Sequence, residues 1–309
     1  MPSLTSLYQS TLKSSDTEEF IDLWFYRPLG FCTALLAAKL RITPNMITVA
    51  SIFIGAAAGV LFYYNELYIN VIGMGLLMIA NLFDSADGQL ARMTNNKTQL
   101  GRILDGFAGN VWFVIIYFAL AFRVDFTEFY GWPDLWIWVV AAVAGISHIQ
   151  HAAIADYYRN IHLYFMDCGK GGEFEHSSPI KEALRTCSFR REPIRKVMLW
   201  FYRNYTVQQE GLTPNFQRFI AKLKAEHPAN ELPKALCVEF RAKSKPLMKY
   251  TNILQFNTRV IALFVCLFFK QPFLYFFFDL VVLNAIMLYM ITRHERICKK
   301  FYTDLLTYN

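Results

Sequence analysis

Acidic residues gather where one apolar stretch of the sequence ends and the next begins. The boundary carries two motifs, Asp84-Ser-Ala-Asp87-Gly88-Gln-Leu-Ala91-Arg92 and Gly101-Arg-Ile-Leu-Asp105. On a helix Asp84 and Asp87 share one face, so two facing helices would bring both close to Asp105. Converging carboxylate oxygens favour Mg²⁺ or Mn²⁺ over zinc. A pair of such ions on a diphosphate would neutralise the charge of a leaving group.

The simpler alternative is that these charges decorate the end of an apolar helix. For a lone acidic pair that alternative is the better one. Here the run continues through small residues to a third carboxylate. Ionisable residues within membrane spans are costly and usually functional, so the longer pattern favours a site.

These residues resemble the CDP-alcohol phosphotransferase family, and in particular its phosphatidylinositol-phosphate synthase-like members. The family signature is D-x2-DG-x2-AR-x8-G-x3-D-x3-D, and the sequence matches it with Asp84, Asp87, Gly88, Ala91, Arg92, Gly101 and Asp105. The segment from Thr43 to Thr48 is similar to the family's opening of its first span. The resemblance covers about residues 27–160 and 250–292.

The resemblance implies a role for each matched residue. It makes Asp84, Asp87 and Asp105 ligands of two divalent ions, Mg²⁺ or Mn²⁺. It assigns contacts with the CDP-linked donor to Gly88, Ala91, Arg92, Asn45, Thr48 and Gly101, the last of which also lets helices approach closely. Family members transfer a phosphatidyl or phospho-alcohol group to a hydroxyl acceptor and release CMP. They also suggest a homodimer.

The fourth acidic position of the signature is Gly109 in this sequence. In the family that residue ligates metal and deprotonates the acceptor. Asn110 stands next to it, but an amide cannot act as a general base. The chain is therefore an inactivated variant, a subgroup with its base elsewhere, or a binding protein without turnover. Asp105 remains a catalytic candidate, and His148 or His151 in the fourth apolar stretch is a candidate substitute base. Alternatively, the histidines only form hydrogen bonds between helices.

The donor and acceptor follow from size and charge. A six-span core resembles enzymes that use CDP-diacylglycerol. Residues 161–250 carry 16 Lys/Arg and 9 Asp/Glu, which favours an anionic acceptor such as inositol phosphate. Its phosphate is expected at Arg159 with loop cations, namely Arg190, Arg191, Arg195 or Lys196. Each loop cation is otherwise a solvated or lipid-facing charge.

Other function classes stay open. A CDP-ethanolamine or CDP-choline type of transferase would act on diacylglycerol or ceramide. A catalytically inactive membrane protein would bind a CDP-lipid and release nothing. A transporter or scramblase would show flux without CMP formation. We expect no nucleic-acid partner, because the basic segment lacks a recognisable binding motif.

The elements that position these residues are apolar runs. Apolar residues make up 55% of the 309, and the runs are long enough for a bilayer. We predict an all-α integral membrane fold whose six transmembrane helices cover about residues 45–64, 68–92, 102–122, 135–158, 253–269 and 272–292. Residues 27–41 are too short to span and predict an interfacial helix. Arg123, at the far end of the third span, is expected to snorkel.

The charge pattern predicts the arrangement in the membrane. Basic segments place both termini and the active site on the cytosolic side. The chain then divides into four parts: an N-terminal part with the interfacial helix, spans one to four with the active site, a basic helical insertion, and spans five and six with a tail, over residues 1–44, 45–160, 161–250 and 251–309. The six scattered cysteines form no CxxC pair and indicate free thiols in a reducing compartment.

Overall fold

The computed structural model describes residues 4–307, except 13, 15, 97, 126, 128–130, 132, 171–175 and 228–231. Within these residues all regular secondary structure is helical, joined by turns and short irregular segments, and no strand occurs. Six helical segments are long and apolar enough to cross a membrane: Pro44–Leu61, Leu67–Met93, Ile103–Arg123, Leu135–Met166, Lys234–Phe268 and Pro272–Leu306. The predicted all-α fold with six spans is confirmed.

Two compact units make up the chain. The first contains residues 1–149 and 256–281, and the second contains residues 150–255 and 282–309. The first unit holds α1 (Leu4–Thr11), the π-helical turn η1 (Asp22–Tyr26), α2 (Arg27–Lys39), α3 (Pro44–Leu61), α4 (Leu67–Met93), α5 (Gln99–Arg123), the start of α7 (Leu135–Met166), α13 (Phe256–Phe268), α14 (Pro272–Phe277) and most of η3 (Phe278–Leu283).

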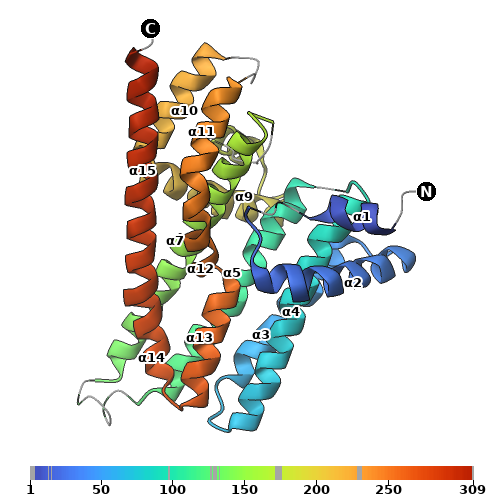
Figure 1. The fold of residues 1–309 in the computed structure, drawn as a ribbon. Coiled ribbons are helices and arrows are strands. Elements are labelled where there is room, and N and C mark those ends of the chain that lie inside the picture. The colour runs from blue at the N-terminus through green and yellow to red at the C-terminus, as the bar shows by residue number, and fades with distance from the viewer. Residues whose placement is uncertain are drawn as a thin grey trace. The chain divides into compact units, whose positions relative to one another are not determined.

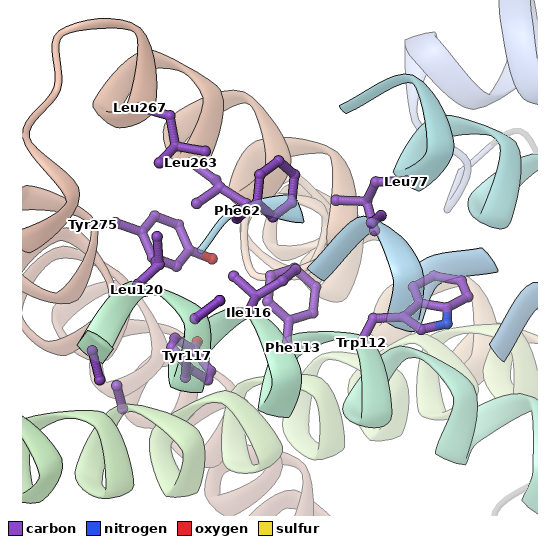
Figure 2. Close-up of a cluster of buried hydrophobic side chains, with 14 of the residues drawn as sticks. Phe62, Leu77, Trp112, Phe113, Ile116, Tyr117, Leu120, Leu263, Leu267 and Tyr275 are labelled. Atoms are coloured by element: carbon purple, nitrogen blue, oxygen red, sulfur yellow. The ribbon is translucent and has the colours of Figure 1, made fainter. Parts of the chain in front are cut away.

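The core of the first unit is apolar and aromatic. Helix α5 contributes Trp112, Phe113, Ile116 and Leu120, which lie against Phe62, Leu77, Leu263, Leu267 and Tyr275 (Figure 2). Gly55 on α3 makes the closest helix crossing, since a Cβ there would lie 2.4 Å from Cδ1 and Nε1 of Trp112. This packing fixes α3 against α5, the helix that carries the third acidic residue.

Helix α2 runs across the ends of α3 and α4 (Figure 1). It is held there by a small apolar cluster of Ala34, Ala37, Ile47 and Leu90. A Cβ at Gly30 would lie 2.6 Å from Oε1 of Gln89 on α4, so the crossing requires a glycine. The predicted helix over residues 27–41 is therefore present, and its crossing orientation fits the interfacial location that we predict.

Arg123 lies at the end of α5 and forms hydrogen bonds with the turn between α3 and α4. Its Nε donates to Asn65 Oδ1 at 3.0 Å, and its Nη1 donates to Phe62 O at 2.9 Å and to Asn70 Oδ1 at 3.3 Å. The guanidinium thus satisfies a carbonyl at the end of α3, where the last carbonyls of a helix lack intrahelical donors. The sequence pattern did not reveal these acceptors of the α3–α4 turn, and snorkelling of Arg123 stays a prediction.

The second unit contains the rest of α7 and six further described helices with the 3₁₀ turn η2: α8 (Ser177–Thr186), α9 (Pro193–Leu212), α10 (Pro214–Glu226), α11 (Lys234–Ser244), η2 (Lys245–Leu247), α12 (Met248–Ile253) and α15 (Asn284–Thr307). Helices α10 and α11 lie beside the C-terminal half of α15 (Figure 1). Stacked rings of Phe165, Phe219 and Phe240 fill its core. The basic segment is thus a packed helical structure.

Candidate active site

The structure brings the three predicted carboxylates together. Asp84 and Asp87 lie near the end of α4, and Asp105 lies on the second turn of α5. One ligand oxygen from each lies within 4.8 Å of the others. Asp87 is buried, Asp84 is half-buried and Asp105 is exposed, so the cluster opens towards one side. Three like charges at this spacing repel one another unless a cation lies among them.

A tight turn sets the geometry of the two helices. Helix α4 ends in a left-handed residue, Asn95, with φ of 51°, and Asn96 N donates back to Ala91 O at 3.0 Å. This pattern is a helix stop in which Asn takes the place that Gly usually fills. Thr98 then begins α5, because its hydroxyl accepts from Gly101 N at 2.9 Å. Asp105 therefore returns to the level of Asp84 and Asp87.

Helix α3 supports the cluster from behind. Thr48 donates from its hydroxyl to Asp87 Oδ2 at 2.5 Å, which orients that carboxylate. A Cβ at Gly101 would lie 2.9 Å from Asn45 Oδ1 and 3.0 Å from Thr98 Oγ1. The sequence prediction that Gly101 allows close helix approach fits this contact. Asn45 and Thr48 both lie beside the acidic helices, and their contact with a donor stays a prediction.

Arg92 supplies an unneutralised cation beside the acids. Its Nε and Nη2 are buried and have no hydrogen-bond partner among the described residues. Its guanidinium lies over Gly88, where a Cβ would be 3.6 Å from Nη2. Asp87 and Asp105 are among the charged groups that act on it. A buried guanidinium with unused donors is costly, and an anionic ligand would satisfy it.

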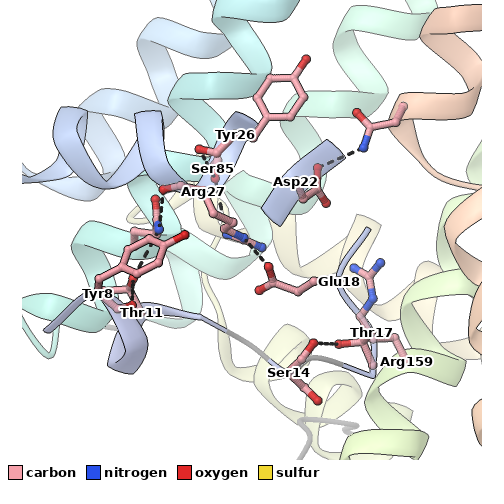
Figure 3. A network of polar contacts seen from close by, with 12 residues as sticks. Tyr8, Thr11, Ser14, Thr17, Glu18, Asp22, Tyr26, Arg27, Ser85 and Arg159 are labelled. Carbon is pink, nitrogen blue, oxygen red and sulfur yellow. Dashed lines mark hydrogen bonds and ion pairs between the residues drawn. The ribbon is translucent and has the colours of Figure 1, made fainter. Parts of the chain in front are cut away.

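The N-terminal residues cover this end of α4, which the sequence did not predict. Gln89 Nε2 donates to Thr11 Oγ1 at 3.3 Å and to Arg27 O at 3.1 Å. Arg27 forms a buried ion pair with Glu18 at 3.0 Å and donates to Ser85 Oγ at 3.4 Å (Figure 3). The N-terminal segment therefore binds to α4 through Ser85 and Gln89, which lie between and just after the acidic residues of the motif.

Position 109 is open. A Cβ there would meet nothing within 4 Å among the described atoms, so the backbone has room for an aspartate. Asn110 does not take its place: its Nδ2 donates to Gly106 O at 2.7 Å, one turn back on its own helix. The side-chain oxygen Oδ1 is buried without a described partner. Helix α5 thus runs through position 109 without interruption and has room there for a Cβ.

The two candidate bases both lie on α7 but have different contacts. His148 stacks on Phe113 with centroids 4.3 Å apart and meets the edge of Tyr117. Phe113 follows Asp105 by two helical turns, about 12 Å along the axis, so His148 lies at a deeper level than the acids. His151 belongs to the second unit, where Nε2 forms a hydrogen bond with Asn284 Oδ1 at 3.2 Å. The catalytic role of both histidines stays a prediction.

The predicted acceptor residues belong to the second unit. Arg159 donates to Gln255 Oε1, and Asn160 Nδ2 donates to Asp156 Oδ2 at 3.3 Å. Among the loop cations, Arg195 pairs with Glu192 at 2.8 Å on an exposed turn. These contacts agree with interhelical and surface roles, and binding of an acceptor phosphate remains a prediction.

Sequence reasoning missed a buried ion pair in the first unit. Arg259 on α13 contacts Asp279 on η3, and both side chains are almost fully buried. Arg259 Nη1 also donates to Tyr117 Oη at 3.5 Å. The signal was present in the sequence, since two ionisable residues stand in apolar spans. The acidic motif of α4 and α5 stood out in the sequence, whereas this pair lies on α13 and η3.

The acidic cluster suits a hard divalent cation. Its donors are carboxylate oxygens from two helices, and Thr48 already orients one of them. Mg²⁺ is commonly held by one or two carboxylates together with phosphate oxygens. Asp84, Asp87 and Asp105 would hold such an ion, with Arg92 beside it for an anion. The ligand set therefore fits the ions that the sequence predicts.

Fold and site together define a multi-span membrane protein with an acidic, cation-binding type of centre. Residues 41–164 match the CDP-alcohol phosphatidyltransferase family. A protein of Aquifex aeolicus (strain VF5), described as uncharacterized, is 36% identical over 67 residues, which are 22% of this chain. The match spans 33% of the length of that relative.

Proposed function

We propose that the chain transfers a phosphatidyl group from CDP-diacylglycerol to the hydroxyl of a polar acceptor such as inositol phosphate, with release of CMP. The observation that carries the proposal is the meeting of three carboxylates with a buried, unpartnered guanidinium within the segment that matches the family. Acids alone would bind a cation, and Arg92 alone would bind an anion. Side by side they suit a diphosphate that arrives with its cation.

The reaction divides between the two kinds of group. The acceptor oxygen forms a bond to the lipid-side phosphorus, and the diphosphate P–O bond breaks with its electron pair on CMP. Arg92 would hold a phosphate of the donor through its unused donors. Thr48 keeps Asp87 oriented throughout. Divalent ions held by the carboxylates would neutralise the charge on the departing nucleotide.

The acceptor proton needs a base, and this is where the chain departs from the family. With glycine at position 109, the remaining carboxylate on that face of α5 is Asp105, one turn earlier. The open space at 109 favours a second candidate function, a protein that binds a CDP-lipid without turnover. A CDP-ethanolamine or CDP-choline type of transfer remains the alternative activity.

Orientation and assembly belong to the same proposal. We expect the acidic centre and both termini on the cytosolic side. The segments that adjoin them are rich in Lys and Arg, and such segments mark the cytosolic side of a membrane protein. The homodimer that the resemblance suggests stays a prediction.

The test is CMP release by the purified protein from CDP-diacylglycerol with Mg²⁺ across a panel of acceptors. Gly109→Asp and Asn110→Asp are measured beside the wild type. Gly106→Asp is the matched control, because position 106 is equally open but is not the acidic position of the signature. CDP-ethanolamine and CDP-choline serve as alternative donors.

Turnover by the wild type would support an enzyme with a relocated base. Turnover by Gly109→Asp alone would support a binding protein derived from an enzyme. If no donor gave CMP with the wild type or any variant, and CDP-diacylglycerol did not bind with Mg²⁺, the proposed function would be wrong.

A further inference from the structure

A basic pocket lies in the second unit, on the helix that follows the last apolar run. Arg293, Arg296, Ile297 and Lys300 of α15 line it together with Lys243 of α11, and its volume is about 380 Å³. The three α15 cations recur at three- and four-residue intervals and so share one face of the helix. No acidic side chain lines the pocket.

The fold separates this basic face from a buried face of the same helix. His294 and Cys298 are buried, and Glu295 points to the start of α10, where it accepts from Asn215 N at 2.6 Å. Glu295 therefore does not neutralise its basic neighbours. Arg293, Arg296 and Lys300 are exposed, and they lie together where α15 borders Lys243 of α11.

The pocket cations lack counter-charges. Within the described part of the chain, no carboxylate pairs with Arg293, Arg296 or Lys300. Lys243 meets Glu239 at 3.6 Å, and both side chains are largely exposed, so this contact neutralises little. Four cations around one hollow repel each other, and a multiply charged anion would remove that repulsion.

The length of the last apolar run places the pocket at the expected depth of the lipid head groups. The apolar run 272–292 would extend about 31 Å as a helix, close to the ~30 Å hydrocarbon thickness of a bilayer. Arg293 is the first residue beyond it. Phosphates of membrane lipids therefore lie within reach of the pocket.

We propose that this pocket binds a phosphomonoester dianion, borne by an anionic lipid such as phosphatidic acid or by a soluble phosphate. Two guanidinium groups offer paired donors to phosphate oxygens, and two ammonium groups add charge. Ile297 supplies an apolar wall for the carbon atoms next to the phosphate. This site does not depend on the proposed transferase activity, because none of its residues belongs to the acidic cluster.

The experiment is native mass spectrometry of the full chain purified in a non-ionic detergent, titrated with phosphatidic acid, phosphatidylglycerol or phosphatidylcholine. Phosphatidic acid should be retained in preference to the other two. Arg293→Gln and Arg296→Gln should each weaken retention about fivefold or more, the scale of one cation near a lipid surface. Lys299→Gln removes an equal charge from α15 outside the pocket, so it should change retention less than twofold.

Inorganic phosphate distinguishes the two sources. Displacement of phosphatidic acid by millimolar phosphate from the wild type would indicate a site that also accepts soluble phosphates. If phosphate did not displace phosphatidic acid, and both pocket variants failed to retain it, the site would be specific for the lipid. The proposal fails if Lys299→Gln weakens retention as much as the pocket variants do, or if neither pocket variant changes it. Thermal unfolding of each variant without ligand checks that the fold is intact.

Discussion

Two groups of ionisable residues in the first unit handle charge in opposite ways. At one end of α4 and α5, three carboxylates converge beside a guanidinium whose donors are unused. In the core, Arg259 and Asp279 neutralise each other and both are buried. The first arrangement brings like charges together, whereas the second pairs opposite charges within the protein. Charge in an apolar helix therefore indicates function only when its surroundings leave it unsatisfied.

The largest expected effect comes from breaking the complete pair. Asp279→Ala leaves Arg259 buried and uncompensated, and removal of one partner of a buried pair costs about 3–5 kcal/mol of unfolding free energy. Arg259→Leu combined with Asp279→Leu should recover much of that loss, because both buried charges are gone. Thermal unfolding in detergent measures both. A single variant as stable as the wild type would show that the pair is not a structural contact.

Arg92 should behave in the reverse manner. Arg92→Gln removes a charge that has no described partner for Nε or Nη2, so it should leave stability unchanged or slightly raised. Binding of CDP with Mn²⁺ should weaken by about 10- to 100-fold, the 1.5–3 kcal/mol range of a hydrogen bond to a charged group. Calorimetric titration measures the affinity. A large loss of stability without loss of affinity would make Arg92 a structural residue like Arg259.

Two glycines test which side of the acidic cluster is packed. Gly101→Ala places a methyl group 2.9 Å from Asn45 Oδ1, so it should destabilise the fold by about 1 kcal/mol and disturb ligand binding. Gly106→Ala meets nothing within 4 Å and should stabilise α5 by about 0.5–1 kcal/mol. Thermal unfolding separates the two. Equal effects would mean that α3 does not press on the turn at Gly101.

The sequence predicted the acidic centre because its residues obey local rules. Helical spacing places Asp84 and Asp87 on one face, and a short polar turn returns the chain to Asp105. The six spans were also predictable from apolar length. The helical spacing, the turn and the span lengths each depend only on residues that are close in the sequence.

The unpredicted parts depend on distant partners. Thr11 meets Gln89, and Arg259 meets Asp279, through packing that no single segment encodes. Helix α11 also escaped prediction, because its turns carry mixed polar residues with little apolar periodicity. The N-terminal cover and the buried pair therefore required the three-dimensional arrangement.

The smallest expected effect gives the most direct test of an incomplete site. In the absence of divalent ions, Asp105→Asn removes one of three mutually repelling carboxylates, so stability should rise by ~0.5 kcal/mol, since the exposed Asp105 is well screened. With millimolar Mg²⁺ or Mn²⁺ the order should reverse, because only the wild type gains from binding the ion. Thermal unfolding with a chelator and then with each ion measures both signs. If Asp105→Asn lowered stability in the chelator, the Asp105 carboxylate would already be paired with a cation of the protein, as Asp279 is with Arg259, and the contrast between the two regions would disappear.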